Sequence, residues 1–559
     1  MENYPLKKNQ DIEIEITGIT GEGSGVGHYN GVAVFTPDTA VGDVIECHII
    51  KTKKSYAIGK VKSVIKSSRD RIIPDCPVFS KCGGCVFRHI DYSAELKLKR
   101  QRVIDAFSRI GHMDFEPDEI LTTGKTERYR NKAQYPVRLD EKGLHIGFFA
   151  RNSHRVADCR DCLLQPKEFR TILDCFAQWI KKYNITVYNE ETHKGLIRHI
   201  YIRKAFSTGD IMVCAVINGH GLPKKNELIS GLIKSCGNIK SIAVNENTES
   251  GNVILGKKCS VIWGSEYIED ILCGIRIRIS PLSFYQVNRD GAELLYKKAA
   301  EFADVKKTDT VLDLYCGAGT IGLSMADKAG RIIGAEIIPQ AVEDAKANAE
   351  MNNIKNAEFI CGDAAEAADV LKDRGVMPEV VIVDPPRKGC SRELLDTIAE
   401  IEPKRLVYVS CDPATLARDC GIMSEKGYSV QKITPVDMFP RTSHVETVVL
   451  LSHKKPDSVI NVKVEFGEGE GKIPLENIEK RAESYKPKER VTYKMIKEYI
   501  EAKYGFKVHT AYIAEVKRDL GLPMYDAPNA VEELKQPRKH PTPEKVEAIK
   551  DALKHFEVI

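Results

Sequence analysis

Short apolar runs alternate with helical stretches from about Leu294 to Ser452, and this alternation limits the folds open to the chain. Runs of this length, each followed by a helix, are typical of consecutive βα units. The alternation therefore predicts a doubly wound, Rossmann-like α/β sheet that binds a ligand at the carboxyl ends of its strands. The predicted strands are Val311 to Tyr315, Arg331 to Ile337, Ala357 to Ile360, Val380 to Val383, Leu406 to Val409 and Val445 to Leu451.

A chain of 559 residues is too long for one hydrophobic core, so we expect further domains beside this sheet. Near the amino terminus, β-branched runs separated by glycine-bearing turns predict a small antiparallel β-barrel of the OB type. A polar stretch rich in glycine and glutamate predicts a linker after the sheet. The expected bounds are 1–68 for the barrel, 69–280 for a mixed α+β central domain, 281–455 for the sheet domain, 456–489 for the linker and 490–559 for a helical extension.

The formal net charge of +4 is small for a chain of this length, so affinity for nucleic acid must come from local basic patches. Residues 1–16 lack the apolar segment of a secretory signal, and no apolar run approaches the ~18 residues needed to cross a bilayer. We therefore expect a cytoplasmic protein with no membrane association, in which most of the 16 cysteines are reduced. We also expect it to act as a monomer.

A glycine-rich turn follows the first predicted strand of the sheet. Gly317 and Gly319 would let the backbone come close to a ligand at this turn. Their spacing with Gly322 also matches the dinucleotide-binding fingerprint, but a single match of this kind is weak evidence. The turn therefore predicts a nucleotide-containing cofactor without identifying it.

Three acidic residues lie in or after successive predicted strands and narrow that choice. Asp313 lies within the first strand, Glu336 ends the second where it would bind ribose hydroxyls, and Asp363 ends the third where it would meet an adenine amino group. This order of features is similar to that of S-adenosylmethionine-dependent methyltransferases. The alternative is an α/β domain in which these acids cap helices.

Asp384 ends the fourth predicted strand, and Pro385 and Pro386 restrict the turn that follows it. Related Asp-Pro-Pro-Tyr turns serve the methylation of adenine amino groups, but Arg387 stands here where the aromatic residue would be. Cys411 follows the next apolar run, at the position of a nucleophile facing the cofactor. The alternative for Cys411 is a buried core thiol.

A nucleophilic cysteine suits methylation of uracil at carbon 5, which is a poor nucleophile by itself. If the Cys411 thiolate adds to carbon 6, charge develops on carbon 5, which can then attack a sulfonium methyl group. A base must afterwards remove the carbon 5 proton, and Glu446 is the candidate, with His444 as the less favoured one. The alternative for Glu446 is a surface carboxylate at the start of a strand.

Together with the segment Ser280 to Asn288, these residues resemble the uracil-5 RNA methyltransferases of the TrmA and RlmD/RlmCD group over about residues 10 to 452. The resemblance implies a TRAM domain in the barrel and formation of 5-methyluridine in 23S ribosomal RNA. Two alternatives remain open: a transfer-RNA methyltransferase and a non-catalytic RNA-binding iron-sulfur protein. The implied cofactor contacts are Gln286, Tyr315, Glu336 and Asp384, with Cys411 as nucleophile and Glu446 as base.

A cysteine cluster lies between the barrel and the central domain. Cys76, Cys82 and Cys85 supply three thiols, and Cys159 or Cys162 could supply a fourth. Four thiolates suit zinc or an iron-sulfur cluster, and spacing alone does not separate the two. The resemblance implies a [4Fe-4S] cluster with Cys162 as the fourth ligand and an architectural role.

Cations alternate with aromatic residues in Glu127 to Pro136, a pattern suited to phosphate contact and base stacking. The RNA-binding candidates are Arg128, Arg130 and Lys132, and the alternative is a basic strand with solvated faces. We also expect a helix from Tyr92 to Ile110 with a basic outer face. That face would carry Lys97, Lys99, Arg100 and Arg102.

Overall fold

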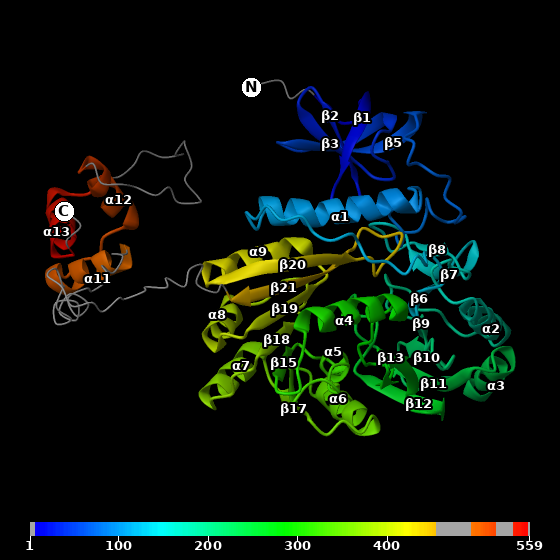
Figure 1. Cartoon of the computed structure of the whole chain (residues 1–559). Coiled ribbons are helices and arrows are strands. Elements are labelled where there is room, and N and C mark those ends of the chain that lie inside the picture. The colour runs from blue at the N-terminus through cyan, green and yellow to red at the C-terminus, as the bar shows by residue number, and fades with distance from the viewer. Residues whose placement is uncertain (1–5, 454–492, 521–539, 557–559) are drawn as a thin grey trace. The chain divides into compact units, whose positions relative to one another are not determined.

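The computed structural model describes residues 6–453, 493–520 and 540–556. The chain divides into two compact units, Met1–Ser458 and Val459–Ile559, and each is described by itself (Figure 1). Every helix among the described residues is either too short or too polar to span a bilayer. The predicted linker, residues 456–489, lies outside the described residues.

The amino-terminal strands close into the predicted barrel, which has five strands in the order β1-β2-β3-β5-β4; the pairing is antiparallel as expected except between β3 and β5, which are parallel. Along β1, Ile12, Ile14 and Ile16 are buried while the acidic residues between them are exposed, as the two-residue repeat of a strand requires. This alternation supplies the barrel core. The strands are β1 (Asp11–Ile19), β2 (Gly25–Tyr29), β3 (Val32–Thr36), β4 (Val44–Thr52) and β5 (Tyr56–Lys66).

A mixed seven-stranded sheet, in the order β12-β11-β10-β9-β6-β7-β8, forms the predicted central domain, between the barrel and the doubly wound sheet in the sequence. Helices α2 (Glu168–Lys182) and α3 (Lys225–Ser235) cover one of its faces with an apolar core that includes Phe169, Phe176 and Trp179. The strands are β6 (Lys132–Asp140), β7 (Gly143–Phe149), β8 (Val156–Asp158), β9 (Ile197–Lys204), β10 (Ile211–Ile217), β11 (Ile239–Glu246) and β12 (Lys258–Gly264).

The second seven-stranded sheet is the predicted doubly wound one, in the order β17-β16-β15-β18-β19-β21-β20. Five strands are parallel, and the chain turns from one half of the sheet to the other between β15 and β18, where such folds bind ligands. The edge strand β20 was not predicted. The strands are β15 (Thr310–Leu314), β16 (Arg331–Glu336), β17 (Ala357–Cys361), β18 (Val380–Val383), β19 (Arg405–Ser410), β20 (Tyr428–Val436) and β21 (Glu446–His453).

Helices cover both faces of this sheet with separate apolar cores. One core includes Val103 and Phe107 of α1, and the other includes Leu295 and Phe302 of α4. The hairpin of β13 (Ile268–Leu272) and β14 (Ile275–Ile279) packs into the α4 side. The helices are α1 (Tyr92–Arg109), α4 (Arg289–Ala303), α5 (Thr320–Leu323), α6 (Pro339–Met351), α7 (Ala364–Asp373), α8 (Arg392–Ile401) and α9 (Pro413–Glu425).

The described part of the second unit consists of α11 (Tyr493–Tyr504), α12 (Thr510–Asp519) and α13 (Pro543–His555). Helix α13 packs against both of the others, so the core combines apolar side chains from all three. Ile496 and Ile500 of α11 are buried there with Ile513 and Val516 of α12, which confirms the helical spacing predicted for this extension.

Candidate active site

The turn after β15 carries an unusual concentration of positive φ angles. Tyr315 has φ 64°, Gly317 has φ 54° and Gly319 has φ 79°. Glycine adopts this region without steric cost, whereas tyrosine does so at a cost that local structure must offset. The turn borders a narrow cavity of about 40 Å³, whose lining includes Phe284, Gln286, Tyr296, Tyr315, Gly317 and Asp384.

Carboxylates hold this turn from two sides. The Gly322 amide donates to Asp313 Oδ2 at 2.9 Å, and the Gly317 amide donates to Glu336 Oε2 at 3.1 Å. Burial raises the pKa of Asp313 to about 7, with smaller contributions from the charges of Asp384 and Glu336. Both residues therefore shape the turn, and Glu336 lies at the end of β16 as predicted.

Two other predicted cofactor contacts lie on neighbouring segments. Asp363 follows β17, where it caps α7 by accepting from the Ala365 amide at 2.9 Å. The Gln286 backbone carbonyl accepts from Asn131 Nδ2 at 2.8 Å, which ties the cofactor side of the crevice to the residue that precedes β6. Tyr296 of α4 lines the same cavity and was missed, because nothing in its local sequence distinguishes it from a core tyrosine.

Cys411 lies directly after β19, and Asp412 beside it caps α9 by accepting from the Ala414 amide at 2.8 Å. The Cys411 thiol is partly exposed. Its pKa is raised to about 11, mainly by burial and also by the charges of Glu446 and Asp384, while Arg387 acts to lower it. The structure thus brings the predicted nucleophile together with two carboxyls and one cation at the strand ends.

Glu446 begins β21 and is 6% exposed, so it is not the surface carboxylate of the alternative interpretation. Burial raises its pKa to about 8, Asp384 raises it and Arg387 lowers it. Burial alone raises the pKa of Asp384, which follows β18, to about 7. These carboxyls can therefore exchange protons near neutral pH, as acid-base catalysis requires.

His444 has a different environment from Glu446. Burial lowers the pKa of its imidazole to about 4, and Arg387, Arg102, Lys99 and Arg130 lower it as well. The ring is consequently neutral at physiological pH, and Arg387, Arg102 and Arg130 add positive charge near it, whereas buried carboxylates pair with Lys99. A positive potential of this kind attracts a polyanion.

Helix α1 holds the segment that leads to Glu446, and Lys99 is central to this contact. Lys99 Nζ donates to Glu95 Oε1 and to Asp437 Oδ1, each at 2.7 Å. Arg102 Nη1 donates to the Ser443 carbonyl at 2.9 Å. The prediction that Lys99 lies on an exposed basic face was wrong, because Lys99 is 1% exposed and bridges two buried carboxylates.

The predicted RNA contacts fall into two groups: Arg128 lies at the cysteine-bearing loop, and Arg130 and Lys132 lie at or just before the start of β6. Arg128 Nη1 donates to Asp161 at 2.8 Å and to the Cys162 carbonyl at 3.0 Å, so it braces the cysteine-bearing loop. Lys132 starts β6, where its pKa is lowered to about 8, mainly by burial and also by the charges of Arg203 and Arg130. Arg130 and Lys132 are thus part of one cationic region.

The predicted cluster thiols lie near one another. The pKa of Cys85 is raised to about 12, mainly by burial and also by the neighbouring thiols Cys162, Cys82 and Cys76. Cys159 donates a hydrogen bond to Cys162, which lowers the pKa of Cys162 to about 7. The donor types fit a four-thiolate site, although no group of three side chains in the described ranges has the arrangement of a metal site.

Two family models match the chain. The tRNA (uracil-5-)-methyltransferase model matches residues 253–454, and the TRAM domain model matches residues 5–62. The first match covers the carboxylates and the thiol of the crevice, and the second covers most of the barrel.

Relatives extend the similarity to most of the first unit. An uncharacterized RNA methyltransferase of Clostridium tetani is 43% identical over 81% of this chain and 98% of its own length. One of Halalkalibacterium halodurans is 42% identical over 80% of this chain and 98% of its own length. The tRNA (uracil-54, C5)-methyltransferase of Pyrococcus abyssi, solved with S-adenosyl-L-homocysteine, is 27% identical, covers 78% of this chain and 99% of its own, and has a TM-score of 0.64.

Proposed function

Because the chain belongs to the RNA (uracil-5-)-methyltransferase family, we propose that it methylates carbon 5 of a specific uridine in 23S ribosomal RNA. The chain is an S-adenosylmethionine-dependent RNA methyltransferase with an amino-terminal TRAM domain. The observation that most supports the proposed chemistry is the electrostatic coupling of Cys411 with Asp384, Glu446 and Arg387. A ribosomal substrate implies a cytoplasmic location.

In the proposed first step, the Cys411 thiolate forms a bond from sulfur to carbon 6 of the uracil. The electron pair of the carbon 5–carbon 6 double bond moves into the ring as an enolate. Arg387 favours this step because its charge lowers the pKa of Cys411. A target uridine in folded RNA must leave its stack to reach the thiol.

When bound, S-adenosylmethionine supplies the methyl group to carbon 5, and its sulfonium cation lowers the pKa of nearby acids. Gln286, Tyr315, Glu336, Asp363, Asp384 and the Gly317 turn would hold it. Glu446 then removes the carbon 5 proton, the ring double bond forms again, and the bond from carbon 6 to Cys411 sulfur breaks. The thiolate is released with the 5-methyluridine product.

The test is a methyl-transfer assay with the full chain, 23S ribosomal RNA and S-adenosylmethionine, followed by mass mapping of methylated uridines. Ribosomal RNA from cells lacking the protein should lose the same 5-methyluridine. A covalent adduct with RNA containing 5-fluorouracil should also form, because the carbon 5 fluorine cannot be removed by a base. A product methylated elsewhere than uracil carbon 5 would contradict the proposal.

A transfer-RNA substrate is the second candidate, because the solved Pyrococcus abyssi relative is a transfer-RNA enzyme. The TRAM domain and the cysteine run favour ribosomal RNA, since the resemblance associates both with ribosomal members. Parallel assays on unmodified transfer RNA and on 23S fragments separate the two. Faster methylation of transfer RNA would favour the second candidate.

We also propose that Cys76, Cys82, Cys85 and Cys162 bind a [4Fe-4S] cluster that has an architectural role. The bracing of the Cys162 loop by Arg128 supports a structural site at this position. An anaerobic preparation should contain about four iron atoms per chain and absorb visible light. Stoichiometric zinc without iron would contradict the iron-sulfur assignment.

Arg130 and Lys132 are the remaining proposed RNA contacts. Their charges lie beside Arg203, and Arg130 also acts on His444 near the crevice entrance. RNA phosphate groups would neutralise this group of cations. Arg128 instead supports the cysteine loop, so its replacement should affect the cluster as well as RNA binding.

A further inference from the structure

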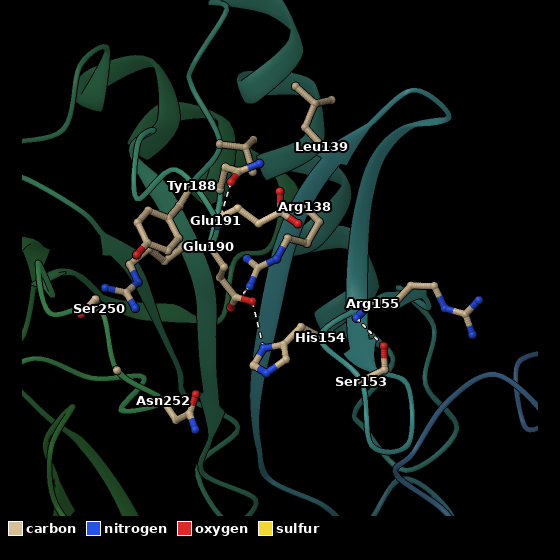
Figure 2. A pocket seen from close by; sticks show the side chains of 14 residues that line it. Arg138, Leu139, Ser153, His154, Arg155, Tyr188, Glu190, Glu191, Ser250 and Asn252 are labelled. Carbon is tan, nitrogen blue, oxygen red and sulfur yellow. Dashed lines mark hydrogen bonds and ion pairs between the residues drawn. The ribbon is translucent and has the colours of Figure 1, made fainter.

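A cavity of about 640 Å³ opens on the central sheet and shares no lining residue with the candidate active site. We call it the central cavity. Its wall combines the end of β6, the turn at residues 153–155, the segment 187–191, β9 and the loop at residues 250–252 (Figure 2). Nothing in the methylation chemistry uses these residues, so their arrangement needs a separate explanation.

Arg198 is the buried cation of this cavity. It is 3% exposed, and its Nη1 donates to the carbonyls of Asn247 at 2.8 Å and Glu249 at 2.5 Å. Its Nε has no hydrogen-bond partner, and no carboxylate in the part of the chain that the structure describes forms an ion pair with it. Its guanidinium carbon lies 4.4 Å from the centroid of the Tyr188 ring. A buried charge without a counterion is costly, so an anion would stabilise this arrangement.

Of the two carboxylates that line the cavity, Glu191 is exposed and Glu190 is already paired with other cations. Glu190 forms an ion pair with Arg138, and its other oxygen lies 2.9 Å from His154 Nδ1. Figure 2 shows these three side chains directed toward one another. Glu190 therefore compensates Arg138 and leaves the charge of Arg198 without a carboxylate.

His199, next to Arg198 in β9, has a pKa that reflects its burial and the positive charge around it. It is 5% exposed, and neither of its ring nitrogens has a hydrogen-bond partner. Burial lowers the pKa of His199 to about 3, and the charges of Arg138 and Arg198 lower it further. The imidazole is therefore neutral, and because Glu190 pairs with Arg138, the uncompensated charge beside it is that of Arg198.

We propose that the central cavity binds one nucleotide of the RNA substrate outside the methylation site, with its phosphate group on Arg198. A volume of about 640 Å³ lies within the usual range of ligand sites and exceeds what a phosphate group alone requires. Asn252 and Tyr188 line the remaining wall, where a base and ribose would lie. This inference rests on the proposed RNA substrate and adds a second anchoring point that fixes how the RNA lies on the enzyme.

The test compares RNA binding by the full chain and two variants over a range of salt concentrations. Arg198→Met removes the cation and keeps the length of the side chain, and Ser250→Glu places a carboxylate on the exposed rim without altering the core. Arg155→Met is the matched control, because Arg155 lines the same cavity but is exposed and points away from Tyr188 (Figure 2). Affinity for S-adenosylmethionine verifies that each variant is folded.

Both Arg198→Met and Ser250→Glu should weaken binding of a labelled 23S fragment, by about fivefold to tenfold, and Arg155→Met should not. The slope of log affinity against log salt should fall by about 0.7 for Arg198→Met, the value for loss of one single-strand phosphate contact. KM for RNA should rise with kcat nearly unchanged, because the cavity contacts no reacting atom. Unchanged affinity and slope in folded Arg198→Met would overturn the inference.

Competition experiments separate an RNA nucleotide from a free one. If uridine 5′-monophosphate binds through Arg198 while the RNA salt slope is the same in wild type and Arg198→Met, the cavity takes a free nucleotide and the RNA assignment is overturned. If RNA binding depends on Arg198 but no uridine is methylated, the cavity inference stands and the proposed function fails. If 23S RNA is methylated but RNA binding does not depend on Arg198, the proposed function stands and the cavity inference is overturned.

Discussion

The two seven-stranded sheets of the first unit bury opposite charges. The doubly wound sheet collects Asp313 and Glu446 at its strand ends, with Asp384 beside them, and burial raises the pKa of each. The central sheet instead buries Arg198 and Arg203, which are 3% and 4% exposed. Within the described residues, neither arginine forms an ion pair with a carboxylate.

This difference indicates that each sheet leaves charge for a ligand to neutralise. Isolated buried charges are costly, so proteins usually pair them internally unless a ligand does so. The carboxyls suit a sulfonium cation, and the arginines suit RNA phosphate groups. We therefore expect the cationic cofactor to bind at the carboxyls and the anionic substrate to contact the arginines.

Cys411→Ala gives the largest expected effect, because it removes the nucleophile from the doubly wound sheet, the one that buries carboxyls. Both 5-methyluridine formation and the adduct with 5-fluorouracil RNA should disappear, while RNA and cofactor still bind. Gel analysis of the adduct and mass mapping measure these effects. Cys361→Ala is the control, because Cys361 is exposed at the end of β17 and should be dispensable. An adduct that persists in Cys411→Ala would refute the nucleophile assignment.

Glu446→Gln should lower turnover by about 10²- to 10⁴-fold, the range for loss of a general base. Addition of Cys411 and methyl transfer need no proton removal by Glu446, so the covalent intermediate should accumulate on unmodified RNA. Denaturing gels and single-turnover kinetics measure it. Glu350→Gln, on the exposed side of α6, is the control. Turnover at the wild-type rate would exclude Glu446 as the base.

The sequence was sufficient to predict the strand ends of the doubly wound sheet. Asp384 follows β18 and Cys411 follows β19, because a buried parallel strand is a continuous apolar run whose end is visible locally. The edge strand β20 was missed, since only part of it is buried and its apolar run is interrupted by Gln431 and Lys432. A strand that is only partly buried leaves a weaker apolar pattern in the sequence than a fully buried one.

The charge environment of the site could not be predicted from the sequence. Lys99 looked like a solvated lysine of α1, but its partners Glu95 and Asp437 are 4 and 338 residues away in the chain. In the sequence, Arg387 was notable only because it replaces the aromatic residue of the related Asp-Pro-Pro-Tyr turn. Its effect on the pKa of Cys411 arises because the turn after β18 lies close to the end of β19 in the fold. Ion pairs between distant segments leave no periodic pattern.

Lys99→Met tests whether α1 stabilises the segment that carries Glu446. The variant leaves Glu95 and Asp437 buried without their shared cation, which should lower the free energy of unfolding by about 3–5 kcal/mol. Urea denaturation monitored by circular dichroism measures this change. Lys97→Met is the matched control, because Lys97 lies on the same helix but is exposed. Equal stability of the two variants would show that the buried network contributes little.

Arg387→Met should give the smallest effect and a diagnostic one, a displaced pH profile. Arg387 lowers the pKa of both Cys411 and Glu446, so its removal raises both. The active forms are the thiolate and the carboxylate, which become populated as pH rises. The ascending limb of kcat/KM against pH should therefore move to higher pH, on the order of one unit for loss of a nearby opposite charge. Arg387→Lys should restore most of the profile, because it returns the cation. A lower rate with an unchanged pH profile would mean that Arg387 acts by contacting RNA. Its role would then resemble the one proposed for the arginines of the central sheet.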